Sequence, residues 1–204
     1  MKKEISLAKF QRNRRLVLFI LVIVIFMATI VVGASGSELR RSYIEAFGLW
    51  FIVAGILGRL WCMLYIGKRK GVELIETGPY SITRNPLYVF SALAALGAGA
   101  QSGSIVLAVI FAIGTVAVFY FVALREEAFL KDRFGAPFNA YCLRVPRFWP
   151  SFRLYRDEPT VFASTDRLYT TLKDGLIFFL AKPAFDFIEY LQLWGFMPIL
   201  VRLI

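Results

Sequence analysis

The chain has 204 residues, of which 58% are hydrophobic, a mean hydropathy of +0.64 and a formal net charge of +10. Soluble domains contain about 45 to 50% apolar residues, so the composition excludes an ordinary soluble domain and indicates an integral membrane protein. The chain has no histidine and only two cysteines, Cys62 and Cys142, which excludes a zinc site and a structural disulfide.

Four apolar segments are predicted to cross the bilayer as helices, and they comprise residues 16–34, 46–66, 85–101 and 104–124. The first, second and fourth have the length of about 20 residues that a hydrocarbon core requires. The third has only about 14 apolar residues, so it must include Asn85 and Pro86 or thin the bilayer locally. The length of the first segment and the basic arm before it argue against a cleaved signal peptide, and we expect this segment to remain in the protein.

Basic residues are distributed unevenly among the connections. They lie before the first span, between the second and third spans and after the fourth, as Lys2, Lys3, Lys9, Arg12, Arg14, Arg15, Lys68, Arg69, Lys70, Arg84, Arg125, Lys131, Arg133, Arg144 and Arg147. The positive-inside rule makes the N-terminus, the second connection and the C-terminal part cytoplasmic, with Arg40 and Arg41 in the first outer loop as exceptions. The basic excess therefore indicates topology and contact with anionic lipid, and nucleic acid is not expected as a partner.

The sequence TGPYSITRNPLYV, residues 77–89, opens the third span. Asn85 is expected to cap the free amides of the helix, with Pro86 at its first position, where a missing N–H costs nothing. A helix N-terminus beside Arg84 forms a site for an anion such as a carboxylate or a phosphate. In the alternative interpretation, Arg84 only reaches the lipid headgroups while the next two residues start a helix.

Glu126 and Glu127 are expected at the end of the fourth span. Because a very short turn joins the third and fourth spans, the two helices must be antiparallel, which returns these carboxylates to the depth of Arg84. Neighbouring helical residues point about 100° apart, so one glutamate can enter a pocket while the other pairs with a basic residue. Acid at a helix C-terminus opposes the macrodipole, which favours a role in binding. The alternative is a solvated helix end, whose ion pairs contribute little to stability.

Two segments carry a family resemblance: GPYSITRNPLYV and, after the apolar hairpin, REEAFLKDRFGAPFNAYCLRVPRFWP. Over residues 71–150 the chain resembles the isoprenylcysteine carboxyl methyltransferase and phospholipid methyltransferase superfamily. That superfamily shows a Gly-x-Tyr turn, an Arg-His-Pro-x-Tyr helix start, a Glu-Glu pair and a Phe-Gly, Tyr, Arg-Val-Pro tail. The resemblance implies a membrane methyltransferase that binds S-adenosylmethionine on the cytoplasmic side and takes a lipophilic or prenylated substrate from the bilayer.

The resemblance also implies the site residues, which are Leu74, Ile75, Tyr80, Arg84, Asn85, Pro86 and Tyr88 on one wall of the cofactor site and Glu126, Glu127, Tyr141 and Arg144 on the other. Arg84 is the candidate for a carboxylate of cofactor or substrate, and Glu126 or Glu127 for the ribose hydroxyls or the amino group. Arg84 and Glu127 are the candidate catalytic residues. The chain departs from the family at Asn85 and Val72, where members have histidine, and this implies weaker cofactor binding or a changed substrate.

The cofactor carries an activated methyl group, so the protein has to align it with a nucleophile and exclude water. A carboxylate needs no general base, whereas an ammonium group must first lose a proton. A chain without histidine therefore favours carboxyl O-methylation of an isoprenylcysteine-like group. The alternatives are N-methylation of a phospholipid or another amine, an NADPH-dependent enzyme like the sterol reductases, and a non-enzymatic lipid-binding protein.

The C-terminal part, residues 151–204, is predicted to be an appendage to a catalytic unit that comprises residues 1–150. Its apolar segment carries charges on one helical face, at Lys182, Asp186 and Glu189. Such a helix is expected to lie in the membrane interface, broken at Pro183 and Gly195, or alternatively to form a fifth span. The predicted fold is an all-helical, multi-pass membrane protein with four spans and a C-terminal amphipathic or partly inserted helical segment.

Overall fold

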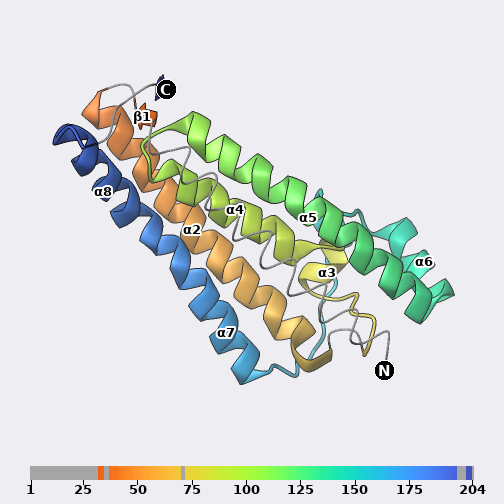
Figure 1. Ribbon diagram of the computed structural model, residues 1–204. Helices are drawn as coiled ribbons and strands as arrows, with labels where there is room; N and C mark the ends of the chain where they lie inside the picture. The colour runs from red at the N-terminus through yellow and green to blue at the C-terminus, as the bar shows by residue number, and fades with distance from the viewer. Residues whose placement is uncertain (1–31, 35–36, 70–71, 197–200, 204) are drawn as a thin grey trace, which may run out of the picture.

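The computed structural model describes residues 32–34, 37–69, 72–196 and 201–203, and this part of the chain is helical apart from one short pair of strands (Figure 1). The helices are α2 (Glu38–Ile66), α3 (Pro79–Ile82), α4 (Pro86–Ala100), α5 (Ile105–Phe134), α6 (Ala136–Arg144), α7 (Thr165–Leu176) and α8 (Ala181–Leu193), with 3-10 turns η1 (Gly67–Arg69), η2 (Phe152–Leu154) and η3 (Ile177–Leu180). Strands β1 (Val32–Ala34) and β2 (Val201–Leu203) pair in parallel. The predicted helical class is confirmed.

Helix α2 begins at Glu38, earlier than the predicted residue 46. The Ser37 hydroxyl caps the helix by accepting a hydrogen bond from Arg40 N at 3.4 Å, and Glu38 in the first turn complements the macrodipole. Arg40 and Arg41, which were predicted in a loop, therefore lie inside the helix. The helix ends at Ile66 as predicted, because Gly67 follows with a φ of +25°.

Helices α4 and α5 form the predicted antiparallel hairpin (Figure 1). Helix α5 continues to Phe134 instead of ending at the predicted residue 124, and Gly135 stops it with a φ of +59°. The prediction that Glu126 and Glu127 lie at a helix terminus is wrong, because no glycine or proline lies between Glu126 and Gly135 to end the helix earlier. Both glutamates project from the interior of a continuous helix.

Helix α4 is buried against α2 through small residues. A Cβ on Gly55 would lie 2.7 Å from Ala94 Cβ, and a Cβ on Gly97 would lie 2.4 Å from Gly48 O. Close backbone approach of this kind is how helices associate in membranes. The 15 residues of α4 extend for about 22 Å at 1.5 Å per residue, which is shorter than a hydrocarbon core of about 30 Å.

Two of the described helices, α2 and α5, are long and apolar enough to cross a membrane. Helix α4 is a shorter apolar helix, so the described residues contain two candidate spans where three were predicted. Residues 16–31 of the predicted first span lie outside the described residues. The last three residues of that span form β1, so the prediction of helix there is wrong. Glycine at position 33 disfavours helix.

The C-terminal helices α7 and α8, joined by η3, run alongside α2 and antiparallel to it (Figure 1). Near the middle of α2, a Cβ on Gly175 would lie 3.6 Å from Ile56 Cβ. Pro183 does not break α8, because it lies in the first turn, where proline is tolerated. Gly195 follows the helix with a φ of +75°.

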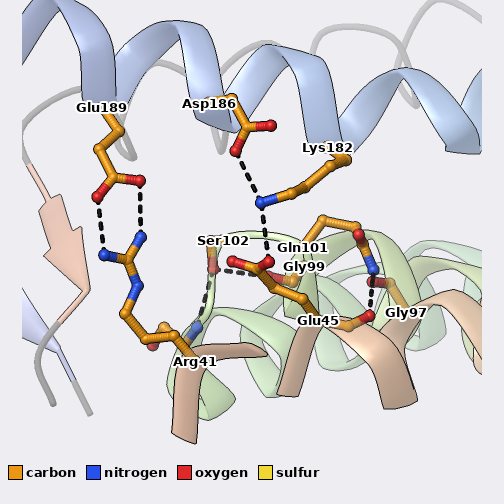
Figure 2. A network of polar contacts seen from close by, with 10 residues as sticks. Arg41, Glu45, Gly97, Gly99, Gln101, Ser102, Lys182, Asp186 and Glu189 are labelled. Carbon is orange, nitrogen blue, oxygen red and sulfur yellow. Dashed lines mark hydrogen bonds and ion pairs between the residues drawn. The ribbon is translucent and has the colours of Figure 1, made fainter. Parts of the chain in front are cut away.

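The charged face of α8 is turned toward α2 (Figure 2). Arg41 donates two hydrogen bonds to Glu189, at 2.7 and 2.6 Å. Lys182 Nζ lies 2.8 Å from Glu45 Oε2 and 2.7 Å from Asp186 Oδ1. These ion pairs fasten α8 to the first turns of α2.

Candidate functional site

The two segments of the signature meet at the start of α4. The backbone N–H of Arg84 donates to Pro146 O at 2.9 Å, and the Thr83 hydroxyl donates to Arg147 O at 3.0 Å. Thr83 is 1% exposed, so this junction is sealed from solvent. The junction holds the link between α3 and α4 directly against the chain that follows α6.

Asn85 does not cap α4 with its side chain, so that prediction is wrong. Its Nδ2 donates to Arg147 O at 3.1 Å and to Glu127 Oε1 at 3.3 Å. The Asn85 carbonyl still accepts from Tyr88 N and Val89 N. That carbonyl already binds the amide of Tyr88, one of those that a cap side chain would bind, and the Asn85 side chain instead bridges α4 to α5 and to the chain after α6.

Glu127 is the centre of a charged cluster that we call the Glu127 cluster: Glu127, Arg84, Asn85 and Arg147. Glu127 Oε2 lies 3.4 Å from Arg84 Nη1 and 2.9 Å from Arg147 Nη2. Arg147 Nε donates to both carboxylate oxygens at 3.1 Å. The Glu127 side chain is 11% exposed and that of Arg84 is 13% exposed. Two guanidinium groups face one carboxylate, which leaves one positive charge in excess.

Arg147 was not among the predicted site residues. It follows Arg144 in the RVPR motif, and this second arginine was the only signal for it. The hydrogen bond to Glu127 raises the pKa of Arg147, so its guanidinium stays charged. Its carbonyl also receives the hydrogen bonds from Thr83 and Asn85, so one residue connects both signature segments.

Glu126 faces a different partner from Glu127, as expected for neighbouring helical positions. The Tyr88 hydroxyl donates to Glu126 Oε2 at 2.7 Å. The Tyr88 ring is stacked on Phe119, with the ring centroids 4.4 Å apart and an interplanar angle of 15°. Tyr88 is therefore held by α5 at two points, one apolar and one polar.

The aromatic and aliphatic site residues lie in the core beneath these charges. The Tyr141 hydroxyl donates to Tyr80 O at 2.7 Å, and burial raises the pKa of both phenols, so they remain neutral. Ile75 packs with Tyr80 in one apolar cluster, and Leu74 packs against Tyr141 and Val145 in another. Pro86 is also fully buried. These residues support the site from below.

Arg144 pairs with Glu76 at the surface. Arg144 connects α6 to the segment before the Gly-x-Tyr turn. The structure thus brings Arg84, Asn85 and Glu127 together and places Arg144 in a separate ion pair.

The Gly-x-Tyr turn is clamped from behind by the segment around Glu158. Gly78 N donates to Arg156 O at 2.7 Å, and the Thr77 hydroxyl donates to Glu158 at 2.5 Å. Gly78 has a φ of +57°, and a Cβ there would lie 2.3 Å from the ring of Tyr65. A glycine is required at this position for both reasons.

The site presents groups of both signs on one face. Arg84 Nε is buried and has no hydrogen-bond partner among the described residues, so this guanidinium has a donor left for an anion. Carboxylates such as Glu126 and Glu127 accept from hydroxyl and ammonium groups. S-adenosylmethionine carries a carboxylate, an ammonium group and ribose hydroxyls, and the residues present fit it. Within the described part of the chain, no group of three His, Cys, Asp or Glu side chains could hold a metal ion.

Comparison with known proteins identifies the family of the chain. The family model for phospholipid methyltransferases matches residues 43–137, which include most of α2, the α4–α5 hairpin and the Glu127 cluster except Arg147. No solved structure matches the chain significantly.

Two curated relatives match most of the chain. The nickel-cobalt-cadmium resistance protein NccN of Alcaligenes xylosoxydans xylosoxydans is 34% identical over 176 residues, which are 84% of this chain and 81% of the relative. The cobalt-zinc-cadmium resistance protein CzcN of Cupriavidus metallidurans is 30% identical over 175 residues, 85% of this chain and 81% of the relative. With the matched family model and the signature residues gathered at the start of α4, these similarities show that the chain belongs to the phospholipid methyltransferase family of membrane methyltransferases.

Proposed function

We propose that this protein transfers a methyl group from S-adenosylmethionine to a carboxylate of a lipophilic, isoprenylcysteine-like substrate in the membrane. The observation that carries the proposal is the Glu127 cluster, in which α4, α5 and the chain after α6 converge on one buried charged site. The basic residues around the cluster support a cytoplasmic location for it, where the methyl donor is present. A catalytic unit comprising residues 1–150, with residues 151–204 as its appendage, is part of the same proposal.

Arg84 is proposed to bind the carboxylate of the cofactor. Its buried Nε has no partner among the described residues, and the excess positive charge of the Glu127 cluster favours an anion. Hydrogen bonds between a guanidinium and a carboxylate are charge-assisted and stronger than neutral ones. Arg147 also pairs with Glu127, so Glu127 keeps a basic partner when Arg84 binds its ligand.

Glu126 and Glu127 are proposed to accept hydrogen bonds from the amino group and the ribose hydroxyls. Tyr88 is held beside Glu126 by a hydrogen bond and by stacking on Phe119. When bound, the cofactor supplies the activated methyl group. The protein's part is to orient cofactor and acceptor and to exclude water, which suits a site built from residues that are mostly buried.

The acceptor is proposed to be a carboxylate because the chain has no histidine to act as a general base. Membranes incubated with the protein and methyl-labelled S-adenosylmethionine should release most of the incorporated label on mild base treatment, since methyl esters are base-labile. Membranes from cells grown with cobalt or nickel are a suitable acceptor source, since both relatives are named for metal resistance. Base-stable label would indicate N-methylation of an amine lipid instead.

The cofactor proposal is tested by thermal unfolding of the detergent-purified protein. S-adenosylhomocysteine at 100 times its dissociation constant should stabilise the folded state by about 2.7 kcal/mol, whereas NADPH should cause no shift. A shift with NADPH alone would support a reductase, and no shift with either would support a non-enzymatic lipid-binding protein.

Asn85 tests whether the departure from the family residue matters. Asn85→His should keep or raise the affinity for S-adenosylhomocysteine, because a ring N–H can replace the amide donor toward Glu127. Asn85→Ala should destabilise the protein by about 1 to 2 kcal/mol, since two hydrogen bonds are lost. Much weaker binding by the histidine variant would show that Asn85 adapts the site to a different ligand.

A further inference from the structure

The chain between residues 146 and 158 runs antiparallel to residues 77–84, which form the Gly-x-Tyr turn, α3 and the link to α4. A series of hydrogen bonds joins the two segments. From the start of α4 backward, they are Arg84 N to Pro146 O at 2.9 Å, Thr83 Oγ1 to Arg147 O at 3.0 Å, Ser151 N to Ile82 O at 2.9 Å, Arg156 N to Ser81 Oγ at 3.0 Å, Gly78 N to Arg156 O at 2.7 Å and Thr77 Oγ1 to Glu158 Oε1 at 2.5 Å. One segment therefore holds α3 along its whole length.

The far end of this segment is fastened to the end of α2 by two neighbouring carboxylates. Glu158 Oε2 lies 3.1 Å from Arg69 Nη2, in the 3-10 turn that follows α2. Asp157 accepts hydrogen bonds from the hydroxyls of Tyr65 and Tyr155, the second at 3.0 Å. The Glu158 side chain is 27% exposed and that of Arg69 is 19% exposed, so their ion pair is partly shielded from water.

Glu158 binds two groups at once, with a different carboxylate oxygen for each. Oε1 accepts from the Thr77 hydroxyl, and Oε2 accepts from the Arg69 guanidinium. The hydrogen bond from Thr77, together with that from Arg69, lowers the pKa of Glu158, so its carboxylate is ionised at neutral pH. Thr77 directly precedes Gly78, whose φ of +57° makes the turn. Glu158 therefore fixes the residue at which the Gly-x-Tyr turn begins.

The turn and the Glu127 cluster are separated only by α3. This helix has four residues, all of them buried, and Arg84 follows its last residue by two positions. Close-packed interiors transmit displacements, because they leave little free volume to absorb them. A shift of Thr77 is therefore expected to move Tyr80 within α3 and Arg84 beyond it.

We propose that Glu158 is a positioning residue for the methyl-donor site. It acts through the hydrogen bond from Thr77, which fixes the Gly-x-Tyr turn and, through α3, the guanidinium of Arg84. The inference rests on the proposed function and adds a residue of the C-terminal appendage to what shapes the donor site. Glu158 lies outside residues 43–137, which the family model matches.

Calorimetric titration of the detergent-purified protein with S-adenosylhomocysteine tests the proposal. Glu158→Ala should lower the affinity on the order of 10-fold, because a hydrogen bond to a charged group no longer holds the turn in its binding geometry. Glu158→Gln should bind almost as tightly as the wild-type protein, since an amide oxygen still accepts from Thr77. A residue that only stabilised the fold would change the unfolding temperature and leave the affinity of the folded protein unchanged.

Thr77→Val tests the route through which Glu158 acts. The substitution keeps a branched side chain and removes the hydroxyl, so it should weaken binding about as much as Glu158→Ala does. The double variant should bind no more weakly than either single variant, because both substitutions break the same hydrogen bond. Thr77→Val is also the milder change, and it tests the proposal even if Glu158→Ala fails to fold.

Glu73→Ala is the matched control. Glu73 also pairs with Arg69, with Oε2 and Nη1 3.6 Å apart, but its side chain is 58% exposed. Its removal takes a carboxylate from the same arginine and leaves the hydrogen bond between Thr77 and Glu158 in place. The affinity for S-adenosylhomocysteine should therefore stay at the wild-type value.

The pattern of affinities decides the proposal. Weaker binding by Glu158→Ala and Thr77→Val, with near-normal binding by Glu158→Gln and Glu73→Ala, supports it. Wild-type affinity in Glu158→Ala overturns the inference and leaves the proposed function in place. Additive losses in the double variant, or an equal loss in Glu158→Gln or Glu73→Ala, also overturn it, since the effect would not pass through Thr77. If the wild-type protein itself does not bind S-adenosylhomocysteine, the proposed function fails and the inference fails with it.

Discussion

Replacing Glu127 with alanine is expected to destabilise the protein by about 3 to 5 kcal/mol, the usual cost of removing one partner of a buried ion pair. Glu127 is 11% exposed and balances Arg84 and Arg147, so the substitution leaves two guanidinium groups facing each other. The alternative interpretation of the sequence, a solvated helix end, would predict only a small effect. Because Glu127 lies well within α5 and its ion pair with Arg84 is mostly buried, a large loss of stability is expected instead. Thermal unfolding with and without S-adenosylhomocysteine measures the effect.

The conservative variant Glu127→Gln separates binding from stability. It keeps the shape of the side chain and one acceptor oxygen, and it should fold, but its affinity for S-adenosylhomocysteine should fall on the order of 10-fold or more, because a charge-assisted hydrogen bond is lost. Glu189→Ala is the matched control. It also removes a carboxylate bonded to an arginine, Arg41, but at the far end of the molecule, so it should leave cofactor affinity unchanged. Equal loss of binding in both variants would contradict the proposed role of Glu127.

Replacing Gly78 with alanine is expected to destabilise the protein by about 2 to 5 kcal/mol. The residue has a φ of +57°, and the added Cβ would lie 2.3 Å from the Tyr65 ring. Overpacking costs about 1 to 3 kcal/mol, and the left-handed backbone adds about 1 to 2 kcal/mol. The Tyr65 ring cannot easily move aside, because its hydroxyl donates to Asp157. Thermal unfolding measures the loss.

Gly135 provides the control for the backbone contribution. Its φ of +59° is nearly the same, but a Cβ there would meet nothing within 4 Å, so Gly135→Ala should show only the smaller, conformational cost. In a double-mutant cycle, Tyr65→Ala should recover the overpacking part of the Gly78→Ala effect. Strictly additive effects of the two substitutions would show that Gly78 and Tyr65 do not clash.

The helical class, the α4–α5 hairpin and the family could be predicted from the sequence because each depends on neighbouring residues. Apolar length predicts a helix that can enter the bilayer, and a turn of a few residues forces its two helices to be antiparallel. The Arg-Asn-Pro helix start and the Glu-Glu pair are contiguous motifs. Arg84 and Glu127 could be predicted to lie close together because the antiparallel hairpin brings Glu127 back to the same membrane depth as Arg84.

Only the tertiary structure decided what each side chain contacts across long separations in the chain. Asparagine is a residue type that commonly caps helices, yet the side chain of Asn85 bonds to residues 42 and 62 positions away. Arg147 enters the Glu127 cluster because α6 turns the chain back toward α4, which no local pattern indicates. The charged face of α8 meets Arg41 and Glu45 of α2, residues about 140 positions earlier in the chain. Periodicity in a sequence determines which residues share a helix face, but the partner of that face depends on how the helices pack. A buried charge is costly unless it is paired, so each charged side chain pairs with an opposite charge that the packing brings within reach.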